Sequence, residues 1–168
     1  MISSPDNLQV IPIDGSAALW QQFGKQILDI ESTAYPSDDL YPEGMLQSFF
    51  ETYSSAIVLL LLGEVLIGYS VARPVGEIWP NRSDEKNTYN ITFTVIKREH
   101  QHKKHVGKIM EVLEDTLRGK GARIIERNAA VKNGYNEKIA RHYGNRVLRS
   151  GPIVVTGYGE QQFFEIAL

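Results

Sequence analysis

A strand, a helix and a second strand follow one another in residues 88–126, and this succession constrains the fold more than any other feature of the chain. Thr88–Ile96 alternates apolar and polar residues, which predicts a strand with one buried face. Apolar residues recur at helical spacing over Val106–Leu117, and Ala122–Glu126 predicts the next strand. Because a crossover of this kind joins parallel strands, the sheet should contain a parallel pair.

The other predicted strands favour antiparallel pairing. Ser55–Leu62 and Val65–Arg73 are rich in Val, Ile and Leu, and Gly63-Glu64 between them is typical of a two-residue hairpin. Pro12 places the first strand, Leu8–Ile13, at a sheet edge, because proline cannot donate to a ladder. Further strands are predicted at Val147-Leu148, Ile153–Val155 and Gln162–Ala167.

Apolar spacing predicts the helices. The first has Ser16 as its N-cap, the second has Pro42 at its first position, and a short one covers Asn136–Tyr143. The apolar faces of the first two are Trp20, Phe23, Ile27 and Ile30, then Met45, Leu46, Phe49, Phe50 and Tyr53. Pro74–Asn87 and Asn128–Tyr135 read as loops, the former with an exposed Trp79.

These elements predict an α+β fold of three layers (α/β three-layer). Its sheet should be mixed and mostly antiparallel, with six to seven strands flanked by about four helices, in a single domain over residues 1–168.

Composition excludes several classes of protein. The chain has no cysteine, which rules out disulfide frameworks, zinc ribbons, thiol nucleophiles and iron–sulfur clusters. The N-terminus has no basic segment followed by an apolar stretch, and the longest apolar run, Ala56–Leu62, falls far short of the ~20 residues of a spanning helix. We therefore expect a cytoplasmic protein with no membrane partner.

Charge is distributed unevenly, although the net charge is only −2. Residues 1–53 carry eight acidic side chains and one basic, a balance of −7 that could attract cations. Residues 97–108 carry five basic side chains and one acidic, a balance of +4, together with three of the four histidines. A helix follows, whose free N–H groups and dipole favour anions, so this junction is suited to phosphate.

Other interpretations of the basic segment remain. It could be a solvated loop or a nucleic-acid contact, although it lacks interleaved aromatic residues and the chain is not basic overall. A metal site at His100, His102 and His105 is disfavoured because Glu99 is the only carboxylate nearby. We expect neither a nucleic-acid partner nor a metal.

The basic segment resembles the pyrophosphate loop of the GNAT superfamily of N-acetyltransferases, Q/R-x-x-G-x-G/A. The matching register is His102-Lys103-Lys104-His105-Val106-Gly107, in which only the final glycine is retained. Asn136 and Tyr143 are spaced as in a later helix of that family, although Gly144-Asn145-Arg146-Val147 replaces the usual Gly-Phe. The order of elements over nearly the whole chain is also similar.

The resemblance implies that acetyl-CoA donates its acetyl group directly to an amine of a small molecule or peptide, with no covalent intermediate. The residues it implies for CoA binding are Val95, His102, Lys103, Lys104, His105, Val106, Gly107, Lys108 and Asn136. Tyr143 would protonate the departing thiolate, unless it is only a packing residue. Glu126, expected at the end of its strand, is the first candidate for the general base, followed by His142 and Glu31.

The resemblance also implies which part of the chain binds the acceptor amine. The region between the first two helices would form one wall of the acceptor cleft, so Glu31, Asp38, Asp39 and Glu43 would favour a cationic amine unless they are merely solvated. Trp79 would form part of the wall of the substrate site, or it would make a packing or homodimer contact. The lost glycine and the altered Gly-Phe leave one alternative for the whole chain, a non-catalytic CoA-binding or interaction module.

Overall fold

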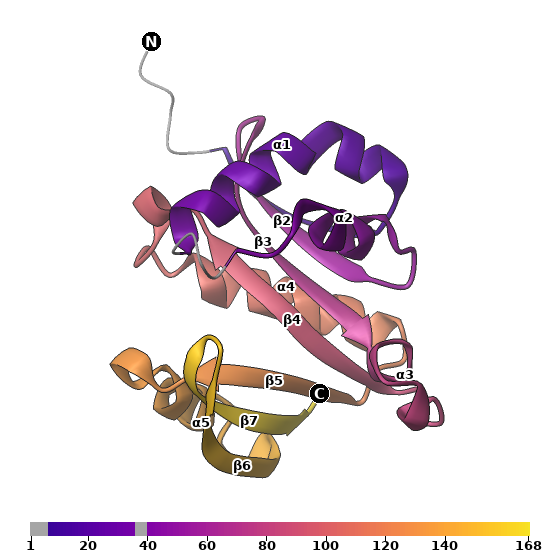
Figure 1. The fold of residues 1–168 in the computed structure, drawn as a ribbon, viewed down its shortest axis with the longest axis vertical. Helices are drawn as coiled ribbons and strands as arrows, with labels where there is room; N and C mark the ends of the chain where they lie inside the picture. The colour runs from indigo at the N-terminus through magenta and orange to yellow at the C-terminus, as the bar shows by residue number, and fades with distance from the viewer. Residues whose placement is uncertain (1–6, 36–39) are drawn as a thin grey trace. The chain divides into compact units, whose positions relative to one another are not determined.

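The computed structural model describes residues 7–35 and 40–168, which form two compact units (Figure 1). The N-terminal unit comprises the chain up to Ala72 together with Phe93–Thr116, and the C-terminal unit comprises Arg73–Thr92 and Leu117–Leu168. Strand β4, Thr88–Ile96, contributes residues to both. The expected single domain stays a prediction.

In the N-terminal unit, an antiparallel hairpin forms the centre of the sheet. It consists of β2, Ala56–Leu62, and most of β3, Val65–Pro74, joined at Gly63, whose φ is +62°. Strand β1, Leu8–Asp14, pairs with β2 and lies at the sheet edge, as Pro12 predicts.

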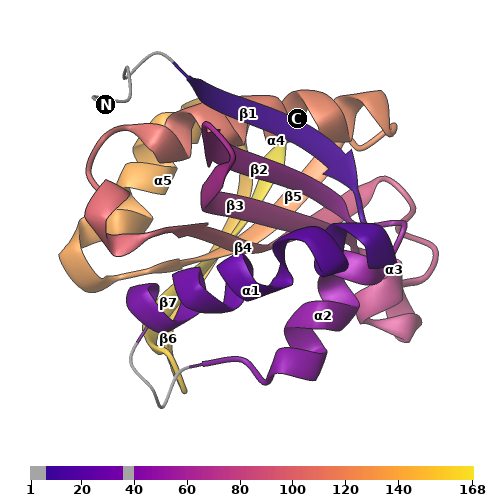
Figure 2. The ribbon, with the colours of Figure 1, turned by 90° about the horizontal axis from the view of Figure 1, so that it is seen from above.

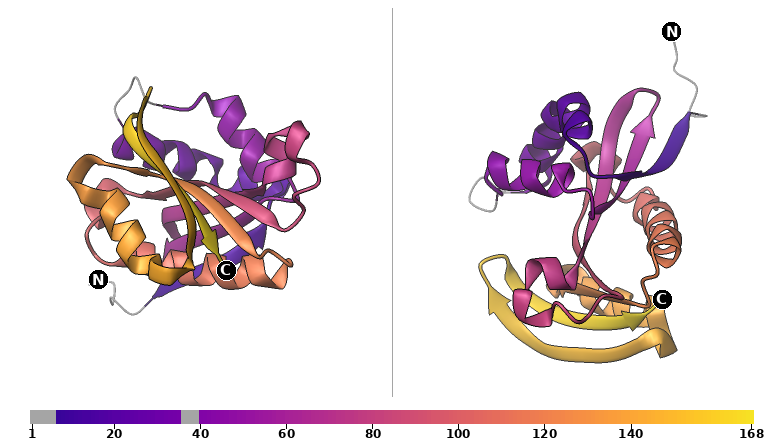
Figure 3. Two further views of the ribbon diagram at one scale, coloured as in Figure 1. Left: turned by 90° about the horizontal axis from the view of Figure 1, so that it is seen from below. Right: turned by 90° about the vertical axis from the view of Figure 1, so that its right-hand side faces the viewer.

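Helices cover both faces of this part of the sheet. Helices α1, Ala17–Ala34, and α2, Glu43–Glu51, lie on one face, and α4, His105–Gly119, lies on the other (Figures 2 and 3). The predicted N-cap of α1 is confirmed, since Ser16 Oγ accepts a hydrogen bond from the Leu19 N–H at 3.2 Å.

The core of the N-terminal unit contains most of the apolar stripes predicted for α1 and α2. Phe23, Ile27 and Ile30 of α1 and Phe50 of α2 are buried there. The prediction was wrong for Met45 and Tyr53, which are exposed, and Tyr53 lies beyond the end of α2.

The C-terminal unit has its own succession of strands. Strand β5, Ile124–Ala130, runs parallel to β4, and β7, Gly159–Ala167, pairs antiparallel with β5. Strand β6, Val147–Thr156, completes a long curved hairpin with β7 (Figure 3). Helix α5, Tyr135–Tyr143, contacts β5 and β7.

Strand β6 lies at the other edge of the sheet, and its pairing with β7 is interrupted. The register shifts between Ser150 and Ile153, where Gly151-Pro152 intervenes. Several apolar side chains of this hairpin are exposed: Leu148, Ile153, Val154, Val155 and Tyr158.

Two segments predicted as loops contain regular structure. Pro74–Asn87 includes helix α3, Val75–Ile78, and the 3₁₀ turn η2, Pro80–Arg82. Strand β5 continues to Ala130, because residues 127–130 pair with β7 despite their polar start. The remaining 3₁₀ turns are η3, Arg98–His100, η4, Lys132–Gly134, and η5, Gly144–Arg146.

The strands have the hydrogen-bonded order β1-β2-β3-β4-β5-β7-β6. This confirms the predicted α+β fold with a mixed, mostly antiparallel sheet. Within residues 7–35 and 40–168 there are seven strands and five α-helices, one more helix than expected because α3 is a single turn. None of the helices in these residues is long and apolar enough to cross a bilayer.

Candidate active site

The basic loop leads from β4 through η3 into the N-terminus of α4. Lys97 Nζ lies 3.0 Å from Asp29 Oδ2 and 3.7 Å from Glu99 Oε1, so its charge is already balanced by carboxylates. Lys103, Lys104 and Lys108 are exposed around the first turn of the helix. An anion at the free N–H groups of α4 would therefore meet these three lysines first.

The backbone of this loop is left-handed at two residues that are not glycine. His102 has a φ of +64° and Lys104 a φ of +59°. Side chains with a Cβ rarely adopt this region, which costs ~1–2 kcal/mol per residue. His105, which stands where the family has its first glycine, is the first residue of α4. The residues with left-handed backbone angles, His102 and Lys104, therefore lie close to His105, which is itself the first residue of the helix.

Gly107 leaves the first turn of α4 open. Apart from the neighbouring residues and the backbone of the helix itself, a Cβ built on Gly107 would meet no atom within 4 Å, and the residue is exposed. A ligand can therefore approach the backbone closely at this turn, and the fifteen-residue helix supplies N–H donors and a positive dipole end. Phosphate oxygens fit this surface.

Two histidines of the loop are partly buried. Burial lowers the pKa of His100 and of His105, and neighbouring lysines add to the effect, Lys103 at the first and Lys108 at the second. His105 Nδ1 is buried without a hydrogen-bond partner among the described residues. The two imidazoles are therefore mostly neutral near pH 7, and an approaching phosphate would favour their protonated forms.

Strand β4 around Val95 is held closely by β3. A Cβ built on Gly68 would lie 2.9 Å from the Val95 carbonyl oxygen, so only glycine allows this approach without a shift. The ladder between β4 and β5 comprises three residue pairs and ends at Asn90 with Glu126. Val95 lies beyond that ladder.

Asn136 presents one amide oxygen with no donor. The Gly151 carbonyl can only accept, so Gln162 must direct its Nε2 toward it, at 3.0 Å. Gln162 Oε1 then accepts from Asn136 Nδ2 at 2.9 Å. This chain of bonds fixes the amide of Asn136 and leaves its Oδ1 buried without a partner in the described part of the chain.

Tyr143 ends helix α5, and its side chain is buried. The ring centroid of His142 lies 4.7 Å from that of Tyr143 in an edge-on contact, and Arg146 Cζ lies 5.2 Å from the Tyr143 ring centroid. These contacts fix the position of the Tyr143 ring.

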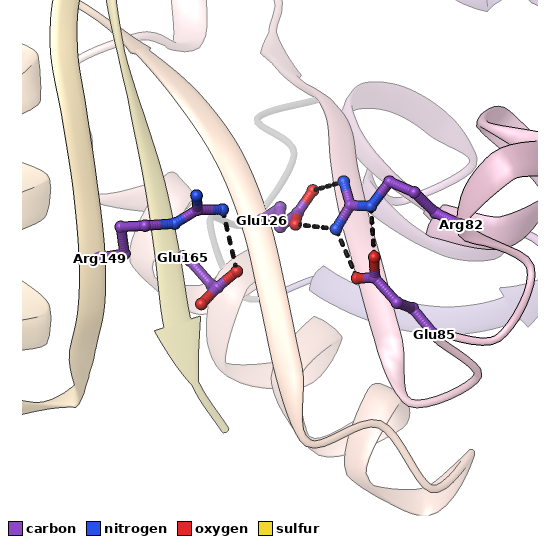
Figure 4. Close-up of polar contacts among 5 residues, drawn as sticks. All are labelled: Arg82, Glu85, Glu126, Arg149 and Glu165. Carbon is purple, nitrogen blue, oxygen red and sulfur yellow. Dashed lines mark hydrogen bonds and ion pairs between the residues drawn. The ribbon is translucent and has the colours of Figure 1, made fainter.

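Glu126 is fully buried, and it forms an ion pair with Arg82 that Figure 4 shows. Arg82 Nη2 lies 2.6 Å from Glu126 Oε1 and Nη1 lies 3.1 Å from Oε2. Arg82 also binds Glu85 through Nε and Nη2, at 2.6 and 2.5 Å, and these bonds raise the pKa of Arg82. The expected position of Glu126 at a strand end is wrong: it is the third of seven residues of β5.

Sequence reasoning missed the partners of Glu126. Glu165 is its register partner on β7, and Arg149 Nη2 of β6 lies 3.4 Å from Glu165 Oε2 (Figure 4). Arg82 Cζ stacks 5.5 Å from the ring centroid of Trp79, which is partly exposed. The three-residue spacing of Arg82 and Glu85 could have indicated their ion pair. No local sequence pattern links Arg82 to Glu126.

The acidic residues expected on the acceptor side have different environments. Glu31 is only 2% exposed, and its Oε1 accepts a hydrogen bond from the hydroxyl of Tyr69. Glu43 is exposed at the start of α2, whereas Asp38 and Asp39 lie outside the described residues. Burial raises the pKa of Glu31, an effect that the Tyr69 hydrogen bond partly opposes.

A metal site is not formed by the side chains that the structure describes. Among residues 7–35 and 40–168, no group of three or more His, Asp and Glu side chains is arranged to hold a metal ion.

Solved structures share this fold. The ribosomal-protein-S18-alanine N-acetyltransferase of Escherichia coli superposes with a TM-score of 0.68 at 12% identity, over 95% of this chain and 93% of that one. A GCN5-related N-acetyltransferase from Kribbella flavida gives 0.66 at 20% identity, over 98% and 100%. The protein yncA of Salmonella typhimurium, solved with its cofactor acetyl-CoA, gives 0.67 at 15% identity, over 95% and 94%.

Sequence comparison identifies the family. No curated protein sequence matches the chain significantly. The sequence profile of the acetyltransferase (GNAT) family matches residues 24–143, which include the basic loop, Asn136 and Tyr143. Since this match covers most of the chain, the protein belongs to the acetyltransferase (GNAT) family.

Proposed function

We propose that this protein is an acetyl-CoA-dependent N-acetyltransferase that transfers an acetyl group directly to an amine of a small molecule or peptide. One observation carries the proposal: β4 leads through a lysine-rich loop into an α4 N-terminus that is left open at Gly107. Backbone N–H groups, a helix dipole and three exposed lysines converge there, which is what a pyrophosphate requires.

The residues of the N-terminal unit fit the donor. The first turn of α4, with His105, Val106, Gly107 and Lys108, would bind the phosphates, and Lys103 and Lys104 would add charge. The exposed His102 could donate from its imidazole to a phosphate oxygen. The backbone of β4 around Val95 would hold the pantetheine and orient the thioester.

In the C-terminal unit, two residues of α5 are assigned by family resemblance. Asn136 Oδ1 would accept from a pantetheine amide N–H, which would satisfy an otherwise unpartnered buried oxygen. Tyr143 would give its hydroxyl proton to the leaving sulfur. When bound, acetyl-CoA supplies an acetyl group activated as a thioester.

The acceptor is proposed to be a cationic amine. The balance of −7 in residues 1–53 supports this through its effect on the local potential, with Asp38 and Asp39 as candidate contacts and Trp79 as a candidate wall. A base role for Glu126 would require Arg82 to release both carboxylate oxygens.

The ion pair between Arg82 and Glu126 favours a second candidate function, a non-catalytic CoA-binding module. A carboxylate held by a bidentate arginine is a poor proton acceptor, and the pyrophosphate motif retains only one glycine.

Two measurements test the proposed function. Calorimetry should show acetyl-CoA binding that weakens as salt rises. Thiol release should then occur with polyamines, amino sugars or Lys-containing peptides, and faster than with aspartate. Binding without thiol release across this panel would support the non-catalytic module, and no binding would contradict both candidates.

Replacing Gly107 by alanine should change stability and donor binding in opposite directions. Alanine is favoured over glycine inside a helix by up to ~1 kcal/mol, and the new Cβ meets no atom, so the free energy of unfolding should rise. The same Cβ would obstruct the approach of phosphate to the backbone, so acetyl-CoA affinity should fall about tenfold or more, measured by calorimetry.

Gly119→Ala provides the matched control, because Gly119 ends the same helix and is equally open. It should leave acetyl-CoA affinity unchanged. An unchanged affinity in Gly107→Ala as well would remove the first turn of α4 from the donor site.

A further inference from the structure

A buried carboxyl group, that of Glu31, lies between α1 and the sheet of the N-terminal unit. It extends from the last turns of α1 to Tyr69 of β3, which donates its hydroxyl proton to Oε1. Tyr69 belongs to the core together with Phe93 and Val95 of β4, and its ring contacts that of Phe50 at 5.2 Å. The pair therefore lies on the sheet face that α1 and α2 cover.

One oxygen of this carboxyl group has no donor. Oε2 is buried, and no described residue forms a hydrogen bond with it. An unsatisfied buried acceptor costs ~1–3 kcal/mol, and more when it is charged. Such atoms are therefore rare, and a catalytic role is one reason for them to be retained. Among residues 7–35 and 40–168, Oε2 has no N–H or O–H donor, and an amine substrate carries one.

The pair also lies beside the part of β4 that we propose holds the thioester. Gly68, the residue before Tyr69, is the point at which β3 comes closest to the Val95 carbonyl. Ser70, the residue after it, contacts Thr94 on the opposite face, with 2.9 Å between the two hydroxyl oxygens. Because side chains alternate along a strand, Tyr69 shares the α1 face with Phe93 and Val95.

We propose that Glu31 Oε2 accepts the proton of the acceptor amine, with Tyr69 as the positioning residue. The inference rests on the proposed function. The ammonium N–H bond breaks as an O–H bond forms on Glu31, and the freed lone pair forms the amide C–N bond. The C–S bond then breaks, the sulfur takes the second amine proton, and Glu31 returns its proton to water.

The electrostatics of the pair suit this role. Burial raises the pKa of Glu31, which brings a carboxylate closer to the strength a base needs near neutral pH. Among the described residues, the titratable neighbours of the pair are Tyr69 from β3 and Tyr35 after the end of α1, while α2 and β4 contribute the apolar Phe50, Phe93 and Val95. Glu126, by contrast, is held at both oxygens by Arg82.

The test uses the best acceptor amine of the panel, with kcat/KM measured against pH. Glu31→Gln keeps the size of the side chain but cannot take the proton, so kcat/KM should fall about 10²–10⁴-fold. The acid limb at the wild-type midpoint should disappear, and only the rise caused by ionisation of the free amine should remain. Glu51→Gln, the same chemical change on α2, should leave both unchanged.

A second variant distinguishes a catalytic base at Glu31 from a Glu31–Tyr69 pair that has only a structural role. The Tyr69 hydrogen bond lowers the pKa of Glu31, so Tyr69→Phe should raise that pKa. Since the protonated carboxyl cannot accept a proton, the acid limb should move to higher pH. A readout independent of turnover is infrared titration of the wild-type protein: a carboxylic acid band absent from Glu31→Gln should titrate with the midpoint of the acid limb.

Three outcomes would overturn the inference. They are an acid limb that keeps its wild-type midpoint in Glu31→Gln, an acid limb that does not move in Tyr69→Phe, and a Glu31 band whose midpoint differs from that limb. If Glu31→Gln does not fold, the other two measurements still decide. Failure of the proposed function is distinct, because the wild-type protein would then release no thiol with any amine.

Discussion

Arg82→Ala is expected to lower the free energy of unfolding by about 3–5 kcal/mol. The substitution leaves the fully buried carboxylate of Glu126 without its bidentate partner, and an uncompensated buried charge has a cost of that size. Denaturant unfolding of the two proteins measures the difference.

The same sheet offers a matched control. Arg149 pairs with Glu165 through one contact of 3.4 Å, and the arginine side chain is 64% exposed, so Arg149→Ala should cost less than about 1 kcal/mol. In the double variant Arg82→Ala/Glu126→Leu, most of the lost stability should return, because the buried charge is removed with its partner. Equal losses in Arg82→Ala and Arg149→Ala would show that Glu126 does not depend on Arg82.

Tyr143→Phe is expected to lower kcat about 10²–10⁴-fold while changing the Kd for acetyl-CoA little. A group that protonates a leaving thiolate acts in the transition state, so its loss affects turnover more than ground-state binding. Phenylalanine keeps the ring between His142 and Arg146, so packing should survive. Steady-state kinetics and calorimetry give the two quantities.

Tyr135→Phe is the control on the same helix. Its hydroxyl accepts a hydrogen bond from Arg127 Nη2 at 2.9 Å, and its removal should leave kcat unchanged. Full activity in Tyr143→Phe would make Tyr143 a packing residue.

The parts of the fold that the sequence predicts are those with strong local periodicity. The β2–β3 hairpin, the cap at Ser16 and the β4–α4–β5 crossover all follow from spacing and turn chemistry. The extension of β5 beyond Glu126 was missed because Arg127 and Asn128 are polar and are held in the strand by β7, more than thirty residues away.

The candidate site is less visible in the sequence, because its interactions are between distant residues. The basic loop and Gly107 stand out as a motif, and Asn136 and Tyr143 as a spacing. The partners of Glu31 and Glu126 are separated from them by 38 and 44 residues, so no local pattern could show that one carboxylate is paired with tyrosine and the other with arginine.

The interruption in β6 bears on how the chain behaves in concentrated solution. An edge strand with exposed apolar residues, including Val155 at 81% exposure, is a template on which other chains can add strands. Gly151-Pro152 divides this edge into two short segments out of register, and the proline removes one donor from it. A foreign strand could therefore align with only one segment at a time, which protects the protein against β-sheet polymerisation.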